Sequence, residues 1–130
     1  CDLRTVPGMA EADVRSLLDG WARAAGAKIV FDDVLAWIPS AEIRVDHPLV
    51  AAAVAATGAV LGAPPPLSVF PGTTDAPWFE AAGIPTLPSL GPGILTHCHG
   101  PNEFVRADAV HEAAEIYART ILAYCGIAGA

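Results

Sequence analysis

The sequence has few charged residues, and few basic ones in particular. Only 16% of its 130 residues are charged, and seven lysines and arginines stand against fourteen aspartates and glutamates, which gives a formal net charge of −7. The basic residues form no cluster, so we expect no binding to nucleic acid or to an anionic membrane surface, because both need a concentrated positive patch. With 53% hydrophobic residues, the chain is too apolar for a disordered segment. We expect a folded domain whose apolar faces need a partner.

The sequence also lacks a membrane-spanning run, a secretory signal and a close pair of cysteines. Its longest apolar run, at residues 48–61, is interrupted by Thr57 and Gly58 and stays below the roughly 18 residues that a spanning helix needs. The three cysteines lie far apart, and an odd number without a Cys-x-x-Cys motif indicates free thiols in a reducing compartment. These features predict a cytoplasmic protein without a membrane role.

No methionine begins the chain, since the first residue is Cys1. Residues 1–6 alternate apolar and polar side chains, which is typical of a half-buried strand. No turn or capping residue precedes them, and a domain rarely begins inside a strand. We therefore expect that an N-terminal segment of the same polypeptide is missing here and covers part of the apolar surface.

The first third of the chain has the pattern strand, helix, strand. After the first strand, residues 11–25 place apolar side chains at helical spacing. This stripe consists of Val14, Leu17, Leu18 and Trp21. Residues 27–38 are rich in β-branched and aromatic side chains, which favours a second strand. The three elements predict half of an α+β sandwich, and we assign residues 1–42 to this domain.

Residues 43–130 have a different pattern, in which helices alternate with short apolar runs. An apolar helix is expected from Leu49 to Leu61, capped by Asp46 or His47 with Pro48 in its first turn, and we expect burial on most of its sides. Short strands are expected at residues 67–70 and 84–87, with a short helix between them that Gly83 ends. The last helix, at residues 108–124, carries one apolar stripe, made of Val110, Ala114, Tyr117, Ile121 and Tyr124. This order predicts an α/β fold with a parallel or mixed sheet.

Residues 91–103 hold the densest group of chemically useful side chains, with His97, Cys98 and His99 in succession. A neutral imidazole is a common zinc ligand, although a histidine that only hydrogen-bonds a backbone group is an equally good interpretation of the pattern alone. A zinc site needs at least three protein ligands, and alternate residues of an extended segment point to opposite faces. We therefore expect that one of the two histidines binds metal and that the other ligands lie elsewhere.

The segment His99-Gly100-Pro101-Asn102-Glu103 resembles the His-x-x-Asn-Glu motif of a zinc peptidase family. That family includes aminoacylases, acetylornithine deacetylases, succinyl-diaminopimelate desuccinylases and carboxypeptidase G. Four further segments are similar to its motifs in the same order: residues 2–8 to an Asp-x-Arg strand, 72–76 to Gly-Thr-Ser/Thr-Asp, 83–86 to Gly-Ile-Pro, and 91–93 to a glycine-rich loop. Each match alone is weak, but together they cover nearly the whole chain.

The resemblance implies a fold and an activity. Residues 1–42 would be the second half of a ferredoxin-like lid, and residues 43–130 the C-terminal part of an α/β catalytic domain. The parent enzyme would hydrolyse the amide bond of an N-acyl amino acid or short peptide with two zinc ions, cobalt being an alternative, and water as the nucleophile. His99 would be a ligand of one zinc ion. The resemblance gives His97 no role beyond that of a loop residue or of a group that orients a ligand.

The resemblance also implies substrate-binding residues. Arg4 matches the lid arginine that pairs with the substrate carboxylate, a role that suits the guanidinium fork; without the resemblance, an outward-facing strand arginine is the simpler interpretation. Thr73 and Thr74 would face substrate, or would only cap the following helix. Gly91 and Gly93 would belong to the substrate loop.

The sequence departs from the family in what it lacks. The His-x-Asp ligand pair, the bridging aspartate and the Glu-Glu pair are absent, so we assign no catalytic residue and expect the chain alone to be inactive. The expected partners are the missing N-terminal segment and a second copy bound through the lid. Two alternatives stay open: a stand-alone binding module that kept the fold without the chemistry, and an unrelated small α/β binding protein with a chance His-x-His.

Overall fold

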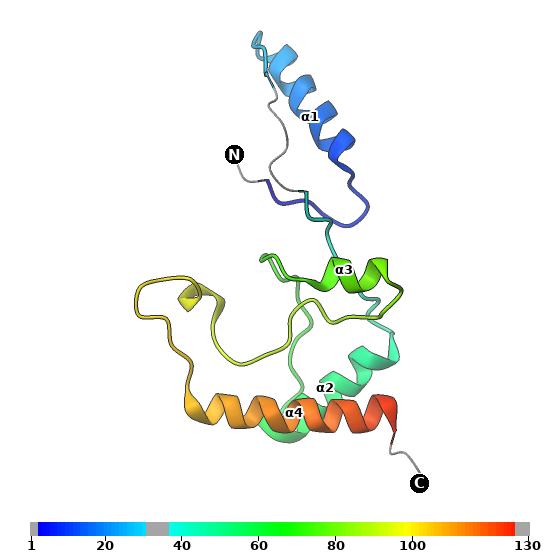
Figure 1. Ribbon diagram of the computed structural model, residues 1–130, viewed down its shortest axis with the longest axis vertical. Helices are drawn as coiled ribbons and strands as arrows, with labels where there is room; N and C mark the ends of the chain where they lie inside the picture. Colours follow the sequence, from blue (N-terminus) through cyan, green and yellow to red (C-terminus); the bar gives the residue numbers. More distant parts are fainter. Residues whose placement is uncertain (1–2, 31–36, 127–130) are drawn as a thin grey trace.

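The computed structural model describes residues 3–30 and 37–126, and its regular elements are helices (Figure 1). In chain order they are α1 (Glu11–Ala24), α2 (Pro48–Leu61), α3 (Ala76–Ala81), the 3-10 helix η1 (Leu95–His97) and α4 (Ala107–Cys125). Figure 1 shows α2 and α4 at one end of the molecule, α1 at the other, and α3 between them. None of the helices in the described ranges is both long enough and apolar enough to cross a bilayer.

Helices α2 and α4 pack against each other and form the core of the described structure. The buried residues of α2 are Val50, Ala53, Ala56 and Thr57, and those of α4 are Ala113, Ile116 and Thr120. Alanines in this contact let the two helices approach closely. The buried hydroxyls of Thr57 and Thr120 donate hydrogen bonds to backbone carbonyls one turn earlier in their own helices, at 2.8 and 2.7 Å, so neither polar group is left unpaired.

Local sequence signals explain where α2 begins and ends. The Nδ1 atom of His47 accepts a hydrogen bond from the backbone N–H of Leu49 at 3.1 Å, and Pro48 occupies the first turn, where its missing N–H costs nothing. Gly62, with φ 82°, adopts the left-handed conformation that ends the helix. The predicted cap and helix are confirmed, with His47 and not Asp46 as the capping residue.

The prediction that α2 is buried on most of its sides is wrong. Only one face of α2 is buried, and Leu61 is 53% exposed. In α4 the apolar stripe described from the sequence is exposed, with Tyr117 at 39% and Ile121 at 58%, while a neighbouring stripe containing Ile116 packs on α2. The physical reason is that α4 is apolar on two sides, and the narrow alanine-lined face of α2 fits the side that carries the smaller residues.

The expected strands are not present in the described residues, so the α/β class is not confirmed. Residues 3–6, 67–70 and 84–87 are in no strand, and the expected strand at residues 27–38 lies partly outside the described residues. A strand is stable only when its backbone pairs with neighbouring strands, and apolar side chains of these segments remain in solvent, such as Val69 at 91% exposure. Within the described residues, no neighbouring strand pairs with these segments.

We expect the α2–α4 contact to carry much of the stability of this chain. Ile116 is 7% exposed, and Ile116→Ala should lower the free energy of unfolding by about 2–3 kcal/mol, toward the lower end for buried isoleucines because the core is thin. Ile121→Ala is the matched control, since Ile121 is 58% exposed in the same helix, and it should change stability by less than about 0.5 kcal/mol. Urea unfolding followed by circular dichroism measures both, and equal losses would contradict this assignment of the core.

Candidate functional site

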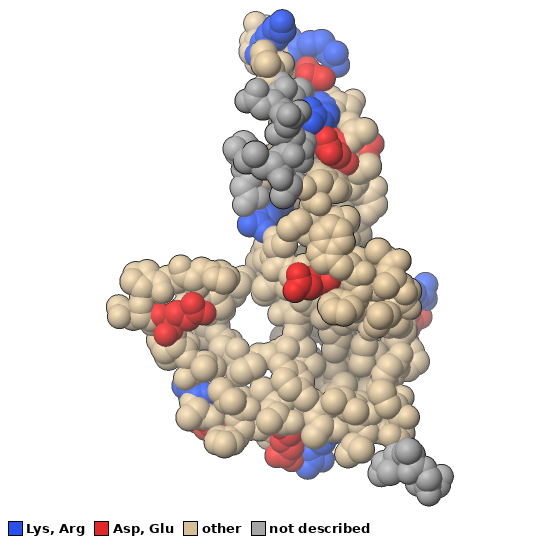
Figure 2. All heavy atoms as spheres, viewed as in Figure 1, with Lys and Arg blue, Asp and Glu red and all other residues tan. Residues whose placement is uncertain are grey.

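The loop expected to carry the site leaves the body of the molecule before α4 and returns to it at the start of that helix (Figure 1). Figure 2 shows an opening between this loop and the rest of the molecule, on a face with few charged side chains. The Tyr117 hydroxyl donates a hydrogen bond to the Leu90 carbonyl oxygen at 2.8 Å and so ties the start of the loop to α4. A Cβ atom at Gly91 would lie 3.0 Å from the same hydroxyl. Gly91 therefore permits a close approach of backbone to side chain.

Gly93 has a backbone reason to be glycine. Its φ of 108° lies in a region that L side chains rarely adopt. The chain then turns through η1 instead of running extended as expected. The substrate-loop role of Gly91 and Gly93 stays a prediction, and both glycines shape the entrance to the loop.

His99 occupies a tight turn after η1. Its φ is 60°, and that of Asn102 is 62°, so two non-glycine residues adopt the left-handed conformation, which costs roughly 1–3 kcal/mol each unless the surroundings hold it. The backbone N–H of His99 donates a hydrogen bond to Oε2 of Glu103 at 3.0 Å. The imidazole of His99 belongs to an exposed residue and can be reached by a metal ion.

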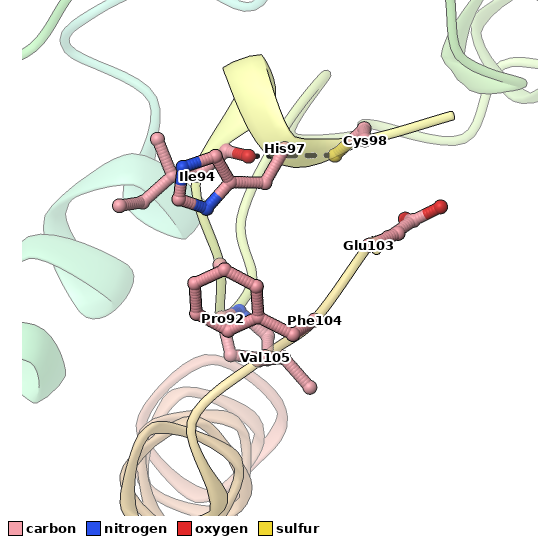
Figure 3. Close-up of a pocket in the computed structure, with 8 residues that line it drawn as sticks. Pro92, Ile94, His97, Cys98, Glu103, Phe104 and Val105 are labelled. Atoms are coloured by element: carbon pink, nitrogen blue, oxygen red, sulfur yellow. Dashed lines mark hydrogen bonds between the residues drawn. The ribbon is translucent and has the colours of Figure 1, made fainter. Parts of the chain in front are cut away.

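His97 lies in a different environment from His99. Its ring faces the ring of Phe104, with centroids 4.8 Å apart and planes inclined by 35°, as Figure 3 shows. The two rings line a pocket of about 300 Å³. The other lining residues are Pro92, Gly93, Ile94, Cys98, Glu103 and Val105. His99 is not among them, so the side chains of the two histidines lie in different environments.

The ring contact of His97 leads to a prediction about its role. If the ring only packs on Phe104, His97→Phe should preserve the loop and change its affinity for Zn²⁺ by no more than about twofold, because aromatic pairs contribute roughly 0.5–1.5 kcal/mol whatever their ring nitrogens. His97→Ala removes the contact and should weaken metal binding several-fold. Metal competition with a chelator measures both variants. Equal and large losses in the phenylalanine and alanine variants would instead make His97 a ligand.

Two of the predicted substrate-binding residues meet in the structure. Nη1 of Arg4 donates a hydrogen bond to Oγ1 of Thr73, which joins the first segment of the chain to the loop before α3. A second contact fixes this first segment: the Ser40 hydroxyl donates a hydrogen bond to the Thr5 carbonyl oxygen at 2.8 Å. Thr74 accepts a hydrogen bond from the backbone N–H of Ala76 at 3.3 Å. This contact belongs to the turn just before α3, whose N-cap residue is Asp75, and Thr73 lies beside the arginine; the substrate roles of both threonines stay predictions.

The charges next to the loop are paired. Arg106 and Asp108 form a hydrogen-bonded ion pair at the start of α4, with Nε and Oδ1 2.9 Å apart. The guanidinium lowers the pKa of the Asp108 carboxyl, and the carboxylate raises the pKa of Arg106. Because both side chains are exposed, the pair contributes little to stability. Its local effect is to neutralise the guanidinium of Arg106, which follows the loop by three residues in the sequence.

The described part of the chain does not bring a full set of metal ligands together. Within residues 3–30 and 37–126, no three histidine, cysteine, aspartate or glutamate side chains come together around a common point. An exposed imidazole such as that of His99 suits a single zinc coordination position. The remaining ligands would have to come from outside the described residues. Cys98 and Cys125 are free and exposed, in keeping with the expectation of free thiols.

Comparison with known proteins gives one result. The family model described as Peptidase family M20/M25/M40 matches residues 15–123. The matched range includes His99, Thr73 and Gly91, and leaves out Arg4. No curated protein and no solved structure gives a significant match.

Proposed function

Since the chain belongs to peptidase family M20/M25/M40, a family of metallopeptidases, we propose that it is part of an amidohydrolase that cleaves N-acyl amino acids or short peptides. The observation that carries the proposal is His99. It is an exposed imidazole in a turn closed by Glu103, inside the range that the family model matches. In this proposal His99 is one metal ligand, and the rest of the ligand set comes from outside the described residues.

The metal chemistry belongs to the intact enzyme, meaning the polypeptide that joins this chain to the rest of the ligands. When bound, a pair of zinc ions, or cobalt in their place, supplies polarisation of the amide carbonyl and acidification of the attacking water. The contribution of this chain is to hold an imidazole at one coordination position. We assign no general base to the described residues.

The substrate contacts of the proposal centre on Arg4 and Thr73. Their hydrogen bond supports a common subsite, because a guanidinium and a hydroxyl side by side can both donate to one carboxylate. Gly91 and Gly93 would let the backbone come close to the substrate, and Thr74 would complete the turn before α3. A free carboxylate on the substrate is therefore the feature that we expect this chain to recognise.

The proposed assembly is a homodimer through the first domain, with the catalytic part completed by an N-terminal segment, in the cytoplasm. Exposed apolar side chains support the need for partners. Trp21 is 65% exposed and Leu17 is 45% exposed on α1, and the outer face of α4 is apolar as well. Such faces are usually covered in the assembled protein.

The test of the proposed function is amide hydrolysis with and without the rest of the enzyme. We expect the 130-residue chain alone to hydrolyse no N-acetyl or N-succinyl amino acid above background with added Zn²⁺ or Co²⁺. It has no assigned base to accept the proton of water and no ligand cluster in its described part to hold two metals about 3.5–4 Å apart.

Adding the separately produced segment that carries the other ligands should restore part of the activity, and His99→Ala should remove the gain. Robust turnover by the chain alone, lost in His99→Ala, would contradict the proposal. Substrate binding without turnover in every combination would favour the stand-alone binding module instead.

A further inference from the structure

We infer that Glu103 is a positioning residue that sets the backbone of His99 and thereby the direction of its imidazole. The inference rests on the proposed function, because it takes His99 as the metal ligand. It starts from one contact: the His99 backbone N–H donates to Oε2 of Glu103 at 3.0 Å. A charged acceptor makes this a stronger hydrogen bond than a neutral one.

The turn that carries His99 depends on this contact. In the described part of the chain, the last backbone hydrogen bond that reaches the turn runs from Cys98 N–H to the Leu95 carbonyl, at 3.1 Å. Pro101 has no N–H to donate. Asn102, with φ 62°, bends the chain so that Glu103 returns to His99. The Glu103 side chain therefore adds to this turn a hydrogen bond that acts directly on the backbone of His99.

The conformation of His99 explains why closure is needed. Its φ of 60° is unfavourable for a residue with a Cβ atom. A hydrogen bond to its own N–H opposes the rotation that would restore a negative φ. Because φ fixes the direction of the Cα–Cβ bond, the carboxylate of Glu103 sets the direction in which the His99 side chain leaves the backbone.

The ring contact between His97 and Phe104 should hold the loop together when the hydrogen bond from His99 to Glu103 is lost. Phe104, the neighbour of Glu103, packs on the ring of His97 at 4.8 Å, and Figure 3 shows this ring pair with Glu103 directed away from it. Removing the Glu103 carboxylate should therefore leave the part of the loop around His97 and Phe104 in place. The loss should be confined to the backbone setting of His99.

The experiment compares three variants. Glu103→Gln keeps a side-chain oxygen that can accept the N–H, Glu103→Leu keeps the bulk without an acceptor, and Glu112→Leu is the control at an exposed glutamate of α4. The first measurement is the chemical shift of the His99 backbone amide proton in the 130-residue chain. The second is the Zn²⁺ affinity of the intact enzyme by chelator competition, with His99→Ala alongside.

We expect the His99 amide signal to move upfield in Glu103→Leu and to stay near its place in the glutamine and control variants. Zinc affinity should fall about ten- to a hundredfold in Glu103→Leu, the usual loss when a group that orients a metal ligand is removed. It should stay within about threefold in Glu103→Gln. A leucine variant that fails to fold would be replaced by Glu103→Ala, with the same expectation.

Two results would overturn the inference without touching the proposed function. One is wild-type zinc affinity in Glu103→Leu while His99→Ala loses it, which would refute the positioning role and leave the proposed function intact. The other is an equal loss in the glutamine and leucine variants, which would refute the hydrogen-bond mechanism. Unchanged zinc affinity in His99→Ala would refute the proposed function itself, and this inference with it.

Discussion

His99→Ala is expected to lower both the metal affinity and the kcat/KM of the intact enzyme by more than about a hundredfold. Removing a group that only orients a metal ligand usually lowers metal affinity or activity about ten- to a hundredfold. Removing the ligand itself should lower them further. The imidazole is exposed and held in a closed turn, so the substitution leaves α2 and α4 untouched and the fold should survive.

The matched control for this variant is His111→Ala. His111 is an exposed histidine of α4 to which we assign no role, and its removal should change activity less than about twofold. Metal content and steady-state hydrolysis of N-acyl amino acids are measured on both variants. Full activity with a full metal complement in His99→Ala would refute the metal assignment.

Arg4→Ala is expected to reduce kcat/KM about ten- to 150-fold on substrates with a free carboxylate. A hydrogen bond to a charged group contributes roughly 1.5–3 kcal/mol, and each 1.4 kcal/mol is a factor of ten. The same substrates capped as esters should show little change, because the partner charge is gone. The hydrogen bond between Arg4 and Thr73 adds a second expectation, that Thr73→Val lowers use of the same free-carboxylate substrates by a smaller factor.

Arg119→Ala serves as the arginine control. Arg119 is paired with Glu115 one turn away on α4. Its substitution should leave kcat/KM unchanged for both the free and the capped substrates. Equal losses on the free and the capped substrates in Arg4→Ala would give this arginine a structural role and would remove the carboxylate subsite from the proposal.

The helices were predictable because their signals are local. The cap at His47 and the left-handed Gly62 and Gly83 mark helix ends through contacts only a few residues apart. The face of α4 that would be buried was not predictable, because α4 is apolar on two sides and the choice depends on α2, about 60 residues earlier in the chain. The short apolar runs were visible too, but whether a run becomes a strand depends on distant partners.

The candidate site was also predictable where its contacts are local and not where they are distant. His99 and Glu103 lie in one short motif, so their proximity followed from sequence, although the motif did not reveal that the hydrogen bond runs from the His99 N–H. From the sequence alone, two roles for Glu103 and Asn102 stay open: to orient the His99 loop, or only to cap it. The anchor from Tyr117 to Leu90 spans 27 residues and has no sequence signal. Only the family resemblance connected Arg4 with Thr73, 69 residues apart.

The most direct measurement is the anomalous scattering of zinc in crystals of the intact enzyme. We expect a zinc peak at about 2.0–2.1 Å from an imidazole nitrogen of His99, the usual Zn–N distance, with no zinc contact to His97. A zinc ion bound at the active site with the imidazole of His99 outside coordination distance would contradict the central claim.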